Sequence, residues 1–271
     1  MTDHPDLFAR NGIDAGRGPC WLLLHPYPLD HRTWEPLARL LAGRFRVVAP
    51  DLPGFGAGRK GDAPWPAGGL SMAFLARRIV TWLRAREIRP AVVAGLSMGG
   101  YVALALAEGW PELVPALVLA DTRARADTDE ERAARLGAIG ELEREGPGAR
   151  DLLARMMVPR LLAPAAPAHL RERVADWVRE TAPAAARAAL RGMAHRPDRR
   201  PVLAGFPGPV LALCGEEDRL TPPAEHEEMA ALARRGRLVR IPGAGHLAPL
   251  ERPGDVARAL LGFWDEEVGR R

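Results

Sequence analysis

The sequence predicts an α/β fold, with a mostly parallel central sheet flanked by helices and a helical insertion. Three observations predict it. Short apolar runs alternate with longer amphipathic runs along most of the chain, as in a parallel sheet covered on both faces. A G-x-S-x-G motif at 95–99 joins a strand-like run to a helix-like run. One helix-rich segment, 123–196, contains no convincing strand. A length of 271 residues suits one such domain with an insertion.

Each element follows from its local pattern. Short apolar or β-branched runs predict strands, apolar residues at helical spacing predict helices, and proline or glycine ends them. Ser71 is placed to cap a helix. The predicted strands cover 21–24, 45–49, 91–94, 116–120, 210–214 and 238–241, and the predicted helices cover 33–42, 72–87, 101–107 and 255–268.

The strand–helix alternation divides the chain into three parts. Residues 1–122 form the first part of the α/β core and 197–271 form the second. Between them, helical stretches in 123–196 are separated by prolines and by a Gly-Pro-Gly turn. We therefore expect 123–196 to be a helical insertion into a single core.

The motif Gly95-Leu96-Ser97-Met98-Gly99 is the most informative feature of the chain. Between a strand and a helix, the serine of this motif sits on a strained turn that exposes its hydroxyl above the sheet edge. A Cβ at either glycine position would crowd that turn. Since Ser71 is the only other serine, a chance match is rare. Ser97 is the predicted nucleophile.

A serine hydroxyl needs a base to take its proton and an acid to orient that base. Among seven histidines, only His246 lies late in the chain, outside a regular element and just after a predicted strand. Its glycine-rich loop allows the backbone to turn the imidazole over the sheet edge. The order of serine, acid and histidine along the chain is the one that follows a G-x-S-x-G turn. His246 is the predicted base.

The acid is expected in the loop after the strand 210–214. This loop carries three adjacent carboxylates at 216–218. We choose Asp218 because its short side chain holds an imidazole with less freedom. Glu217 is the second choice, and Asp121, just past another strand, is the third.

Acyl transfer also needs two N–H donors for the oxyanion. The residue after the nucleophile, Met98, is one expected donor through its backbone N–H. The other should come from the loop after the first core strand, where Pro26 and Pro28 have no N–H. We therefore expect the second donor to be the backbone N–H of Tyr27.

Composition excludes several classes of function. The chain is 47% hydrophobic and 27% charged, as in ordinary globular proteins. Its net charge is +4, but the arginines are interleaved with acids and no nucleic-acid-binding signature is present, so we expect no nucleic-acid partner. No apolar run approaches a membrane span. Residues 1–6 do not resemble a signal peptide, which predicts a cytoplasmic protein.

Two further features of the composition bear on stability and metal binding. Cys20 and Cys214 have no metal or redox spacing and are expected to be buried apolar residues. Asn11 is the only asparagine, glutamine is absent, and proline is abundant at 26 residues. Few amides and many prolines are typical of heat-stable proteins, although a GC-rich genome would give the same bias.

Together these residues resemble the α/β-hydrolase family over essentially the whole chain. The resemblance is carried by Asp218, Gly245-His246 and three segments, 24–30 (LHPYPLD), 50–56 (PDLPGFG) and 95–100 (GLSMGG). The loops HPYPLD and GHLAPLE are similar to those of 3-oxoadipate enol-lactonases and related esterases.

The resemblance has structural implications. It implies that 123–196 forms a helical cap over the site. It implies two strands between those of Cys20 and Cys214, so these lie roughly 14 Å apart, too far for a disulfide. Two departures stand out. Pro26 replaces the family's usual glycine beside the oxyanion position, and the short segment before Cys20 predicts a trimmed sheet edge.

The predicted function is hydrolysis of a small carboxylic ester or lactone through an acyl-enzyme on Ser97, and the resemblance implies neither a metal nor an organic cofactor. A serine at this turn argues against dehalogenase or epoxide hydrolase chemistry, since those related enzymes need a carboxylate nucleophile. The alternatives are a cofactor-free haloperoxidase or perhydrolase, which resembles the same motifs, and a non-catalytic protein that binds a small molecule.

The substrate and the oligomeric state are not predicted. Arg123 or Arg125 would suit a substrate carboxylate, but exposed arginines are the preferred interpretation. Five apolar residues of the insertion either line a pocket or, the preferred interpretation, mostly pack the insertion onto the core. They are Leu152, Leu153, Met156, Met157 and Trp177.

Overall fold

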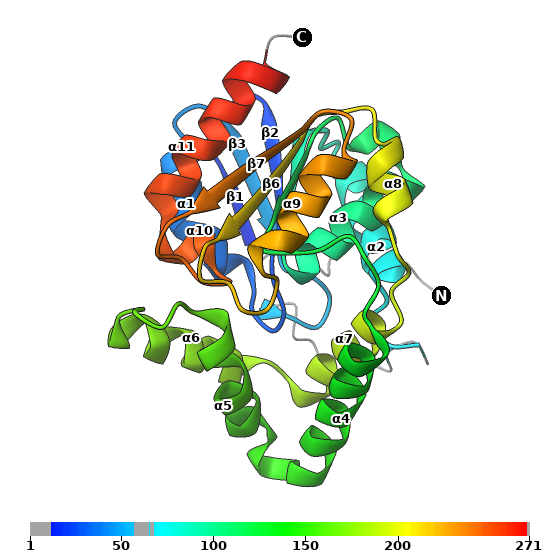
Figure 1. Cartoon of the computed structure of the whole chain (residues 1–271), viewed down its shortest axis with the longest axis vertical. Helices are drawn as coiled ribbons and strands as arrows, with labels where there is room; N and C mark the ends of the chain where they lie inside the picture. The colour runs from blue at the N-terminus through cyan, green and yellow to red at the C-terminus, as the bar shows by residue number, and fades with distance from the viewer. Residues whose placement is uncertain (1–11, 57–64, 66–67, 270–271) are drawn as a thin grey trace.

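The computed structural model describes residues 12–56, 65 and 68–269. The strands are β1 (Gly12–Ala15), β2 (Cys20–Leu24), β3 (Arg46–Pro50), β4 (Pro90–Leu96), β5 (Leu117–Ala120), β6 (Val210–Gly215) and β7 (Gly236–Ile241). They form one seven-stranded sheet in the order β1-β3-β2-β4-β5-β6-β7 (Figure 1). Only β1 runs antiparallel to its neighbour. The predicted α/β class and mostly parallel sheet are confirmed.

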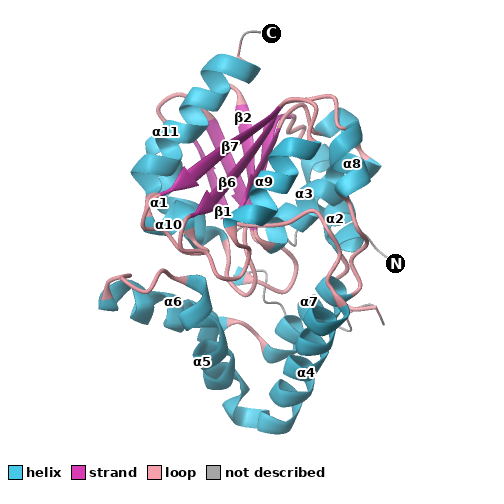
Figure 2. Cartoon of the chain, in the orientation of Figure 1, coloured by secondary structure: helices cyan, strands magenta, loops and turns pink. Residues whose placement is uncertain are grey.

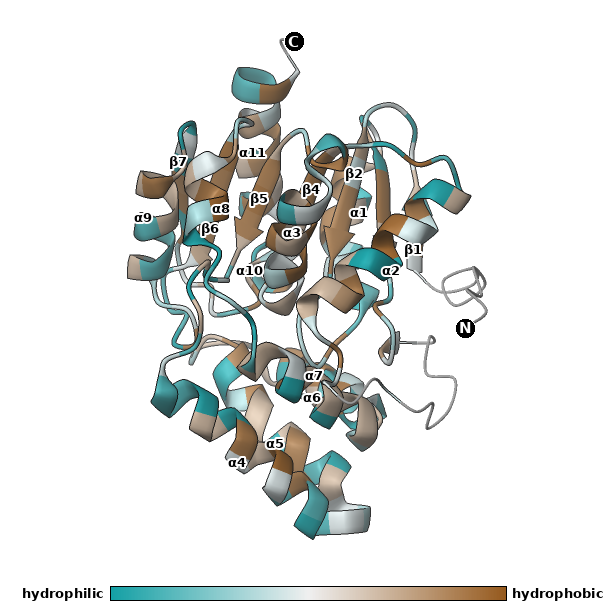
Figure 3. Ribbon diagram, turned by 90° about the vertical axis from the view of Figure 1, so that its right-hand side faces the viewer, coloured by the Kyte–Doolittle hydropathy of each residue, from teal (hydrophilic) through white to brown (hydrophobic). Residues whose placement is uncertain are grey.

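The sheet is the core of the molecule because helices cover both of its faces (Figure 2). Strands β2, β5 and β6 are buried along their whole length, as expected for parallel strands between two helix layers. The edge strand β7 is buried only at its last residue. Figure 3 shows the most hydrophobic colours on the central strands.

One helix layer consists of α1 (Glu35–Leu41) and α11 (Pro253–Phe263), and the other of α2 (Met72–Ala85), α3 (Met98–Gly109), α8 (Arg200–Gly205) and α9 (Pro223–Leu232) (Figure 3). As predicted, the Ser71 side chain caps α2 by accepting a hydrogen bond from the Phe74 N–H at 3.2 Å. The short helices are η2 (His31–Trp34), η4 (Pro111–Leu113), η5 (Gly146–Gly148) and α10 (Ala248–Glu251), and a π-helical turn, η6, follows α11 (Trp264–Val268).

Four α-helices lie between β5 and α8: α4 (Asp129–Glu145), α5 (Ala149–Leu161), α6 (Ala168–Glu180) and α7 (Pro183–Ala194). They lie together at the end of the sheet to which the parallel strands point (Figure 1). Helix α4 begins with a capping box formed by Thr128 and Glu131. All four helices lie within the predicted insertion 123–196. The division of the chain at 122 and 196 remains a prediction.

The boundaries of several elements differ slightly from the predicted ones. The helix predicted from residue 33 begins as a 3-10 turn at His31, because the Asp30 carboxylate accepts a hydrogen bond from the Arg32 N–H. The helix predicted over 255–268 begins at Pro253 and changes to π-helical geometry at Trp264. The hydrophobic pattern of a sequence does not show which hydrogen bonds form at a helix end, so it does not fix these boundaries.

The two cysteines and the sheet edge agree with the resemblance. Cys20 and Cys214 are free and buried, and strands β4 and β5 separate their strands. Among the described residues a single four-residue strand, β1, precedes β2. The expectation about a signal peptide concerns residues 1–6, which lie outside the described residues. No described helix is both long and apolar enough to cross a membrane.

The helices α4 to α7 make up what we call the four-helix segment. A buried charge cluster joins its two ends. Asp127 precedes α4, and Arg196 follows α7. The Asp127 carboxylate accepts hydrogen bonds from Arg196 Nη1 at 2.6 Å and from Arg135 Nε at 2.8 Å. The side chains of Asp127 and Arg196 are almost completely buried. The Arg196 guanidinium also lies 4.1 Å from the centre of the Tyr101 ring.

We expect Asp127→Asn to lower the free energy of unfolding by about 3–5 kcal/mol, because it leaves a buried guanidinium without its counter-charge. Burial alone would raise the pKa of Asp127, but Arg135 and Arg196 hold that pKa below its usual value. The stabilisation is therefore complete above the unfolded-state pKa of about 4 and is lost as the pH falls through the lower folded-state value. Urea unfolding at neutral and acidic pH measures the effect.

Asp129→Asn is the matched control. Asp129 is nearly fully exposed and pairs with Arg132 within α4. Its replacement should cost less than about 1 kcal/mol. A similarly small cost for Asp127→Asn at neutral pH would contradict a stabilising role for the buried cluster.

Candidate active site

Ser97 lies on the sharp turn between β4 and α3, at the carboxyl end of the sheet. Its backbone has φ +53° and ψ −114°, a strained conformation for a residue with a side chain. A Cβ on Gly95 would overlap the carbonyl oxygen of Gly99, and a Cβ on Gly99 would overlap that of Leu24. These two close approaches explain both glycines of the motif.

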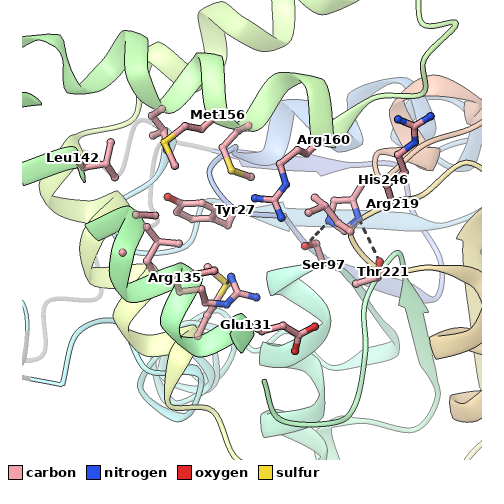
Figure 4. A pocket seen from close by; sticks show the side chains of 18 of the residues that line it. Tyr27, Ser97, Glu131, Arg135, Leu142, Met156, Arg160, Arg219, Thr221 and His246 are labelled. Carbon is pink, nitrogen blue, oxygen red and sulfur yellow. Dashed lines mark hydrogen bonds between the residues drawn. The ribbon is translucent and has the colours of Figure 1, made fainter. Parts of the chain in front are cut away.

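Three loops at this end of the sheet bring Ser97, His246 and Asp218 together. The Ser97 hydroxyl donates a hydrogen bond to His246 Nε2 at 2.7 Å (Figure 4). His246 Nδ1 donates to Asp218 Oδ2 at 2.8 Å. His246 and Asp218 are almost completely buried. The predicted nucleophile, base and acid thus form one continuous chain of hydrogen bonds.

The Asp218 carboxylate is held by four donors. Oδ1 accepts from the backbone N–H groups of Leu220 at 2.8 Å and Thr221 at 3.0 Å. Oδ2 accepts from the Thr221 hydroxyl at 2.5 Å and from His246. Burial would raise the pKa of Asp218, but His246 and these hydrogen bonds lower it to about 2. The carboxylate is therefore ionised at neutral pH and fixed in orientation.

The two other candidate acids lie elsewhere. Glu217, the second choice, is exposed to solvent. Asp121, the third choice, is fully buried, and its carboxylate accepts from the backbone N–H groups of Gly215 at 2.8 Å and Ala248 at 3.2 Å. Burial and the nearby charge of Asp218 raise the pKa of Asp121. Asp121 therefore links the end of β6 to the segment that follows His246.

Glu251 also supports the histidine loop. Its Oε1 accepts from the N–H groups of Gly245 at 2.9 Å and Leu247 at 3.3 Å, the two residues that flank His246. Its Oε2 accepts from the N–H of Ala163, which follows α5, at 2.8 Å. Burial raises the pKa of Glu251. One carboxylate thus ties the histidine loop to the four-helix segment.

Sequence reasoning missed the contributions of Thr221 and Glu251. Glu251 lies within the segment GHLAPLE that carries the resemblance, but its contact with Ala163 depends on tertiary structure. Thr221 follows Asp218 by three residues, a spacing that allows a side chain to fold back onto the carboxylate. The hydrophobic pattern of the sequence therefore predicts neither the Thr221 contact nor the Glu251 contact.

The predicted oxyanion residues lie next to the nucleophile. Met98 is the first residue of α3 and is buried. Tyr27 follows β2, is buried, and lines the same cavity as Ser97. Pro26 is accommodated in a tight turn, since its carbonyl oxygen accepts from the Leu29 N–H and from His25 Nδ1, each at 3.0 Å. The donor roles of the Tyr27 and Met98 N–H groups remain predictions.

Ser97 and His246 open into a cavity of about 580 Å³ between the sheet and the helices α4, α5 and α7 (Figure 4). Of the five apolar residues considered for a pocket, Leu153, Met156 and Met157 line this cavity. Trp177 instead packs against the guanidinium of Arg32, 5.1 Å from the ring centre. Leu153, Met156 and Met157 therefore form an apolar part of the cavity wall.

The expectation that Arg123 and Arg125 are exposed is wrong. Arg123 is buried and Arg125 is partly buried. Both guanidinium groups pair with Glu131, and Arg125 also pairs with Glu225 at 2.6 Å. The acidic partners come from α4 and α9, so only tertiary folding brings them to these arginines.

The predictions include no metal site. Within the described part of the chain, Asp30, His31 and Asp51 bring three possible ligand atoms within 4.8 Å of one another. These side chains are already engaged, since His31 Nδ1 bonds to Asp51 at 2.7 Å and the Asp30 carboxylate binds Arg32. The cluster functions as a hydrogen-bond network between the loops after β2 and β3, and we assign no metal to it.

With this geometry established, comparison with known proteins identifies the family. The model of the α/β hydrolase family matches residues 21–259. The chain belongs to this family. A solved thermophilic esterase from Thermogutta terrifontis, with malate bound, is 34% identical, covers 94% of this chain and 92% of its own, and superposes with a TM-score of 0.85. The enol-lactonase from Burkholderia xenovorans shares the fold at 24% identity and a TM-score of 0.78, over 95% and 96% of the two chains.

Two curated relatives carry different names. A pimeloyl-[acyl-carrier protein] methyl ester esterase from Stenotrophomonas maltophilia is 31% identical over 92% of this chain and 94% of its own length. A Mycobacterium tuberculosis protein with the provisional name non-heme bromoperoxidase BpoC is 31% identical over 86% of this chain and 88% of its own. In sequence this α/β hydrolase is thus similar both to esterases and to a protein with a peroxidase name.

Proposed function

We propose that this protein is a serine hydrolase that cleaves a small carboxylic ester or lactone through an acyl-enzyme on Ser97. The observation that carries the proposal is the continuous hydrogen-bond chain from Ser97 through His246 to Asp218. A buried, ionised carboxylate holds the imidazole so that Nε2 faces the serine hydroxyl. Esterases among the relatives support the same reaction class.

Acylation uses the residues as follows. Ser97 Oγ attacks the carbonyl carbon while its proton passes to His246 Nε2, and the carbonyl oxygen becomes an oxyanion. The backbone N–H groups of Tyr27 and Met98 stabilise this oxyanion. The bond to the leaving oxygen then breaks, and His246 returns the proton to that oxygen. The acyl group remains on Ser97 as an ester.

Deacylation repeats the sequence with water. His246 takes a proton from water, which attacks the acyl carbon, and the second oxyanion forms at the same two N–H groups. His246 then protonates Ser97 Oγ as the acid leaves. Every proton moves between His246 and an oxygen, so the reaction requires neither a metal nor an organic cofactor. We also propose that 123–196 acts as a cap that encloses the substrate.

The proposal is tested with a fluorescent phosphonate ester and a panel of p-nitrophenyl esters and lactones. An activated serine should become phosphonylated, with one label per chain in intact-mass analysis and the modified peptide containing Ser97. The fraction of ester hydrolysis that is lost should equal the fraction of chains that carry the label. Failure to label Ser97 in protein that hydrolyses the esters would contradict an acyl-enzyme at this residue.

The second candidate is a cofactor-free haloperoxidase or perhydrolase, and the relationship to the provisionally named bromoperoxidase favours it. In this reaction hydrogen peroxide replaces water in deacylation and yields a peracid that oxidises halide. Peroxide-dependent bromination in acetate buffer, at a rate above ester hydrolysis, would favour this candidate. Tight binding of a small molecule without hydrolysis of any ester would instead indicate a non-catalytic member of the family.

A further inference from the structure

The charges that line the cavity are unbalanced. Four arginines and two glutamates line it. Two of the arginines have acidic partners, since Arg123 pairs with Glu131 and Arg135 pairs with Asp127. Arg160 and Arg219 form no ion pair or hydrogen bond with any residue that the structure describes. Among the described residues, the lining therefore has two arginines, Arg160 and Arg219, and one glutamate, Glu141, without an ion-pair partner.

Arg160 is the cation best placed to meet a substrate. It lies in the last turn of α5, and its guanidinium extends from the helix into the cavity, towards Ser97 and His246 (Figure 4). Arg219 lies on the loop beside Asp218, and its guanidinium points away from the cavity centre (Figure 4). Arg160 is an exposed residue, but partial burial of its guanidinium and the positive charge of Arg135 lower its pKa. A bound anion would relieve this repulsion.

Tyr27 forms part of the cavity wall near Arg160. Tyr27 is almost completely buried, and its hydroxyl has no hydrogen-bond partner among the described residues. The hydroxyl oxygen is itself buried and lies at the end of the ring away from Arg160 (Figure 4), so it is not placed to share a ligand with that guanidinium. In Figure 4 the Tyr27 ring extends along the cavity, with Arg160 near one side and the methionine-lined wall near the other.

We propose that the protein acts on esters or lactones that carry a carboxylate, which Arg160 binds. This proposal rests on the proposed hydrolase function and adds the class of substrate. A guanidinium presents paired donors that match the two oxygens of a carboxylate. The apolar wall formed by Leu153, Met156 and Met157 accommodates the carbon chain between the carboxylate and the ester. Arg160 is thus a specificity-determining residue.

The test compares substrates that differ only in charge. Monomethyl glutarate is paired with methyl 4-carbamoylbutanoate, and acetoxyacetate with acetoxyacetamide, so that the carboxylate lies on the acyl or the alcohol side. The ratio of kcat/KM for carboxylate over amide should exceed about 10 in at least one pair. Arg160→Gln should lower that ratio about 10- to 100-fold, the effect of losing a charge-assisted hydrogen bond. Because Arg160→Lys keeps the positive charge, this variant should retain part of the wild-type ratio.

Arg155→Gln is the matched control. Arg155 lies on the same helix, is largely exposed, does not line the cavity, and makes only a long 3.8 Å contact with Glu145. The Arg155→Gln substitution removes the same charge as Arg160→Gln, but it should leave the ratio of kcat/KM for carboxylate over amide unchanged. An equal preference for both members of each pair in the wild type, or an equal change in the ratio for Arg155→Gln and Arg160→Gln, would overturn the proposal.

A binding measurement separates this proposal from the proposed function. Calorimetric titration of the Ser97→Ala protein with glutarate should show binding that Arg160→Gln weakens at least about 10-fold. If hydrolysis requires Ser97 but the substrate ratios and glutarate binding are insensitive to Arg160, the carboxylate proposal alone fails. If Ser97→Ala hydrolyses the substrates as fast as the wild type, the hydrolase mechanism fails, whatever the result for glutarate.

Discussion

Ser97→Ala is expected to lower kcat for ester hydrolysis by about 10⁴- to 10⁶-fold. The Ser97 hydroxyl is the atom that would form the acyl-enzyme, and it lies 2.7 Å from the imidazole nitrogen that would take its proton. Alanine leaves His246 and Asp218 in place but removes the atom that reacts. The activity that remains would come from substrate binding and the oxyanion donors alone. Steady-state kinetics on the best p-nitrophenyl ester measure the loss.

The chain provides its own control, because Ser71 is the only other serine. Ser71 caps α2 through the Phe74 N–H, so Ser71→Ala should cost about 1 kcal/mol of stability and leave kcat unchanged. The comparison separates the loss of a hydroxyl from the loss of the nucleophile. A Ser97→Ala protein that keeps more than about one hundredth of wild-type kcat would be incompatible with covalent catalysis at this position.

Most of the sheet could be predicted from sequence because each strand is a short apolar run bounded by turn residues. The strand predicted over 210–214 agrees with β6 to within one residue. The positions of Ser97 and His246 could be predicted because a strained turn and a glycine-rich loop leave a local signature. Choosing Asp218 among three adjacent carboxylates drew on side-chain length and on the family resemblance. Its hydrogen bonds appear only in the folded chain.

The pairing of the arginines could not be predicted. Nearly every base in this chain is an arginine, so the sequence offers many possible partners for each acid. Arg123 looks like a solvated residue in sequence, but the fold buries it beside Glu131 and the Leu220 carbonyl. Arg160 looks the same, yet it faces the cavity without an acid. The difference between a structural and a substrate-binding arginine is decided by tertiary packing.

The same limit applies to the supports of the histidine loop. Asp121 and Glu251 each bind backbone N–H groups on segments distant in sequence. Their carboxylates bind the backbone around His246, although neither residue contacts the imidazole in these bonds. Backbone groups carry no side-chain signature, so sequence patterns cannot reveal which carboxylate will bind them.

Asp218→Asn is expected to lower kcat about 10⁴-fold while preserving the fold. The carboxamide oxygen should occupy the Oδ1 position, because two backbone N–H groups point at it. The amide nitrogen then replaces Oδ2 and donates to His246 Nδ1. The imidazole must accept there, so its proton moves to Nε2. Nε2 then donates to Ser97 Oγ and cannot accept the serine proton.

Glu217→Gln is the control for this substitution, since it makes the same chemical change on the adjacent, exposed residue. Its kcat should match the wild type. Urea unfolding of Asp218→Asn should show a folded protein, so that the lost activity reflects the tautomer and not the fold.

The pH dependence of kcat adds a second readout. In the wild type, protonation of Asp218 should not limit kcat above about pH 3, because Asp218 with a pKa of about 2 is already ionised there. An Asp218→Asn protein that keeps more than about one tenth of wild-type kcat would show that the imidazole is oriented by other groups, with Thr221 the nearest at 3.3 Å.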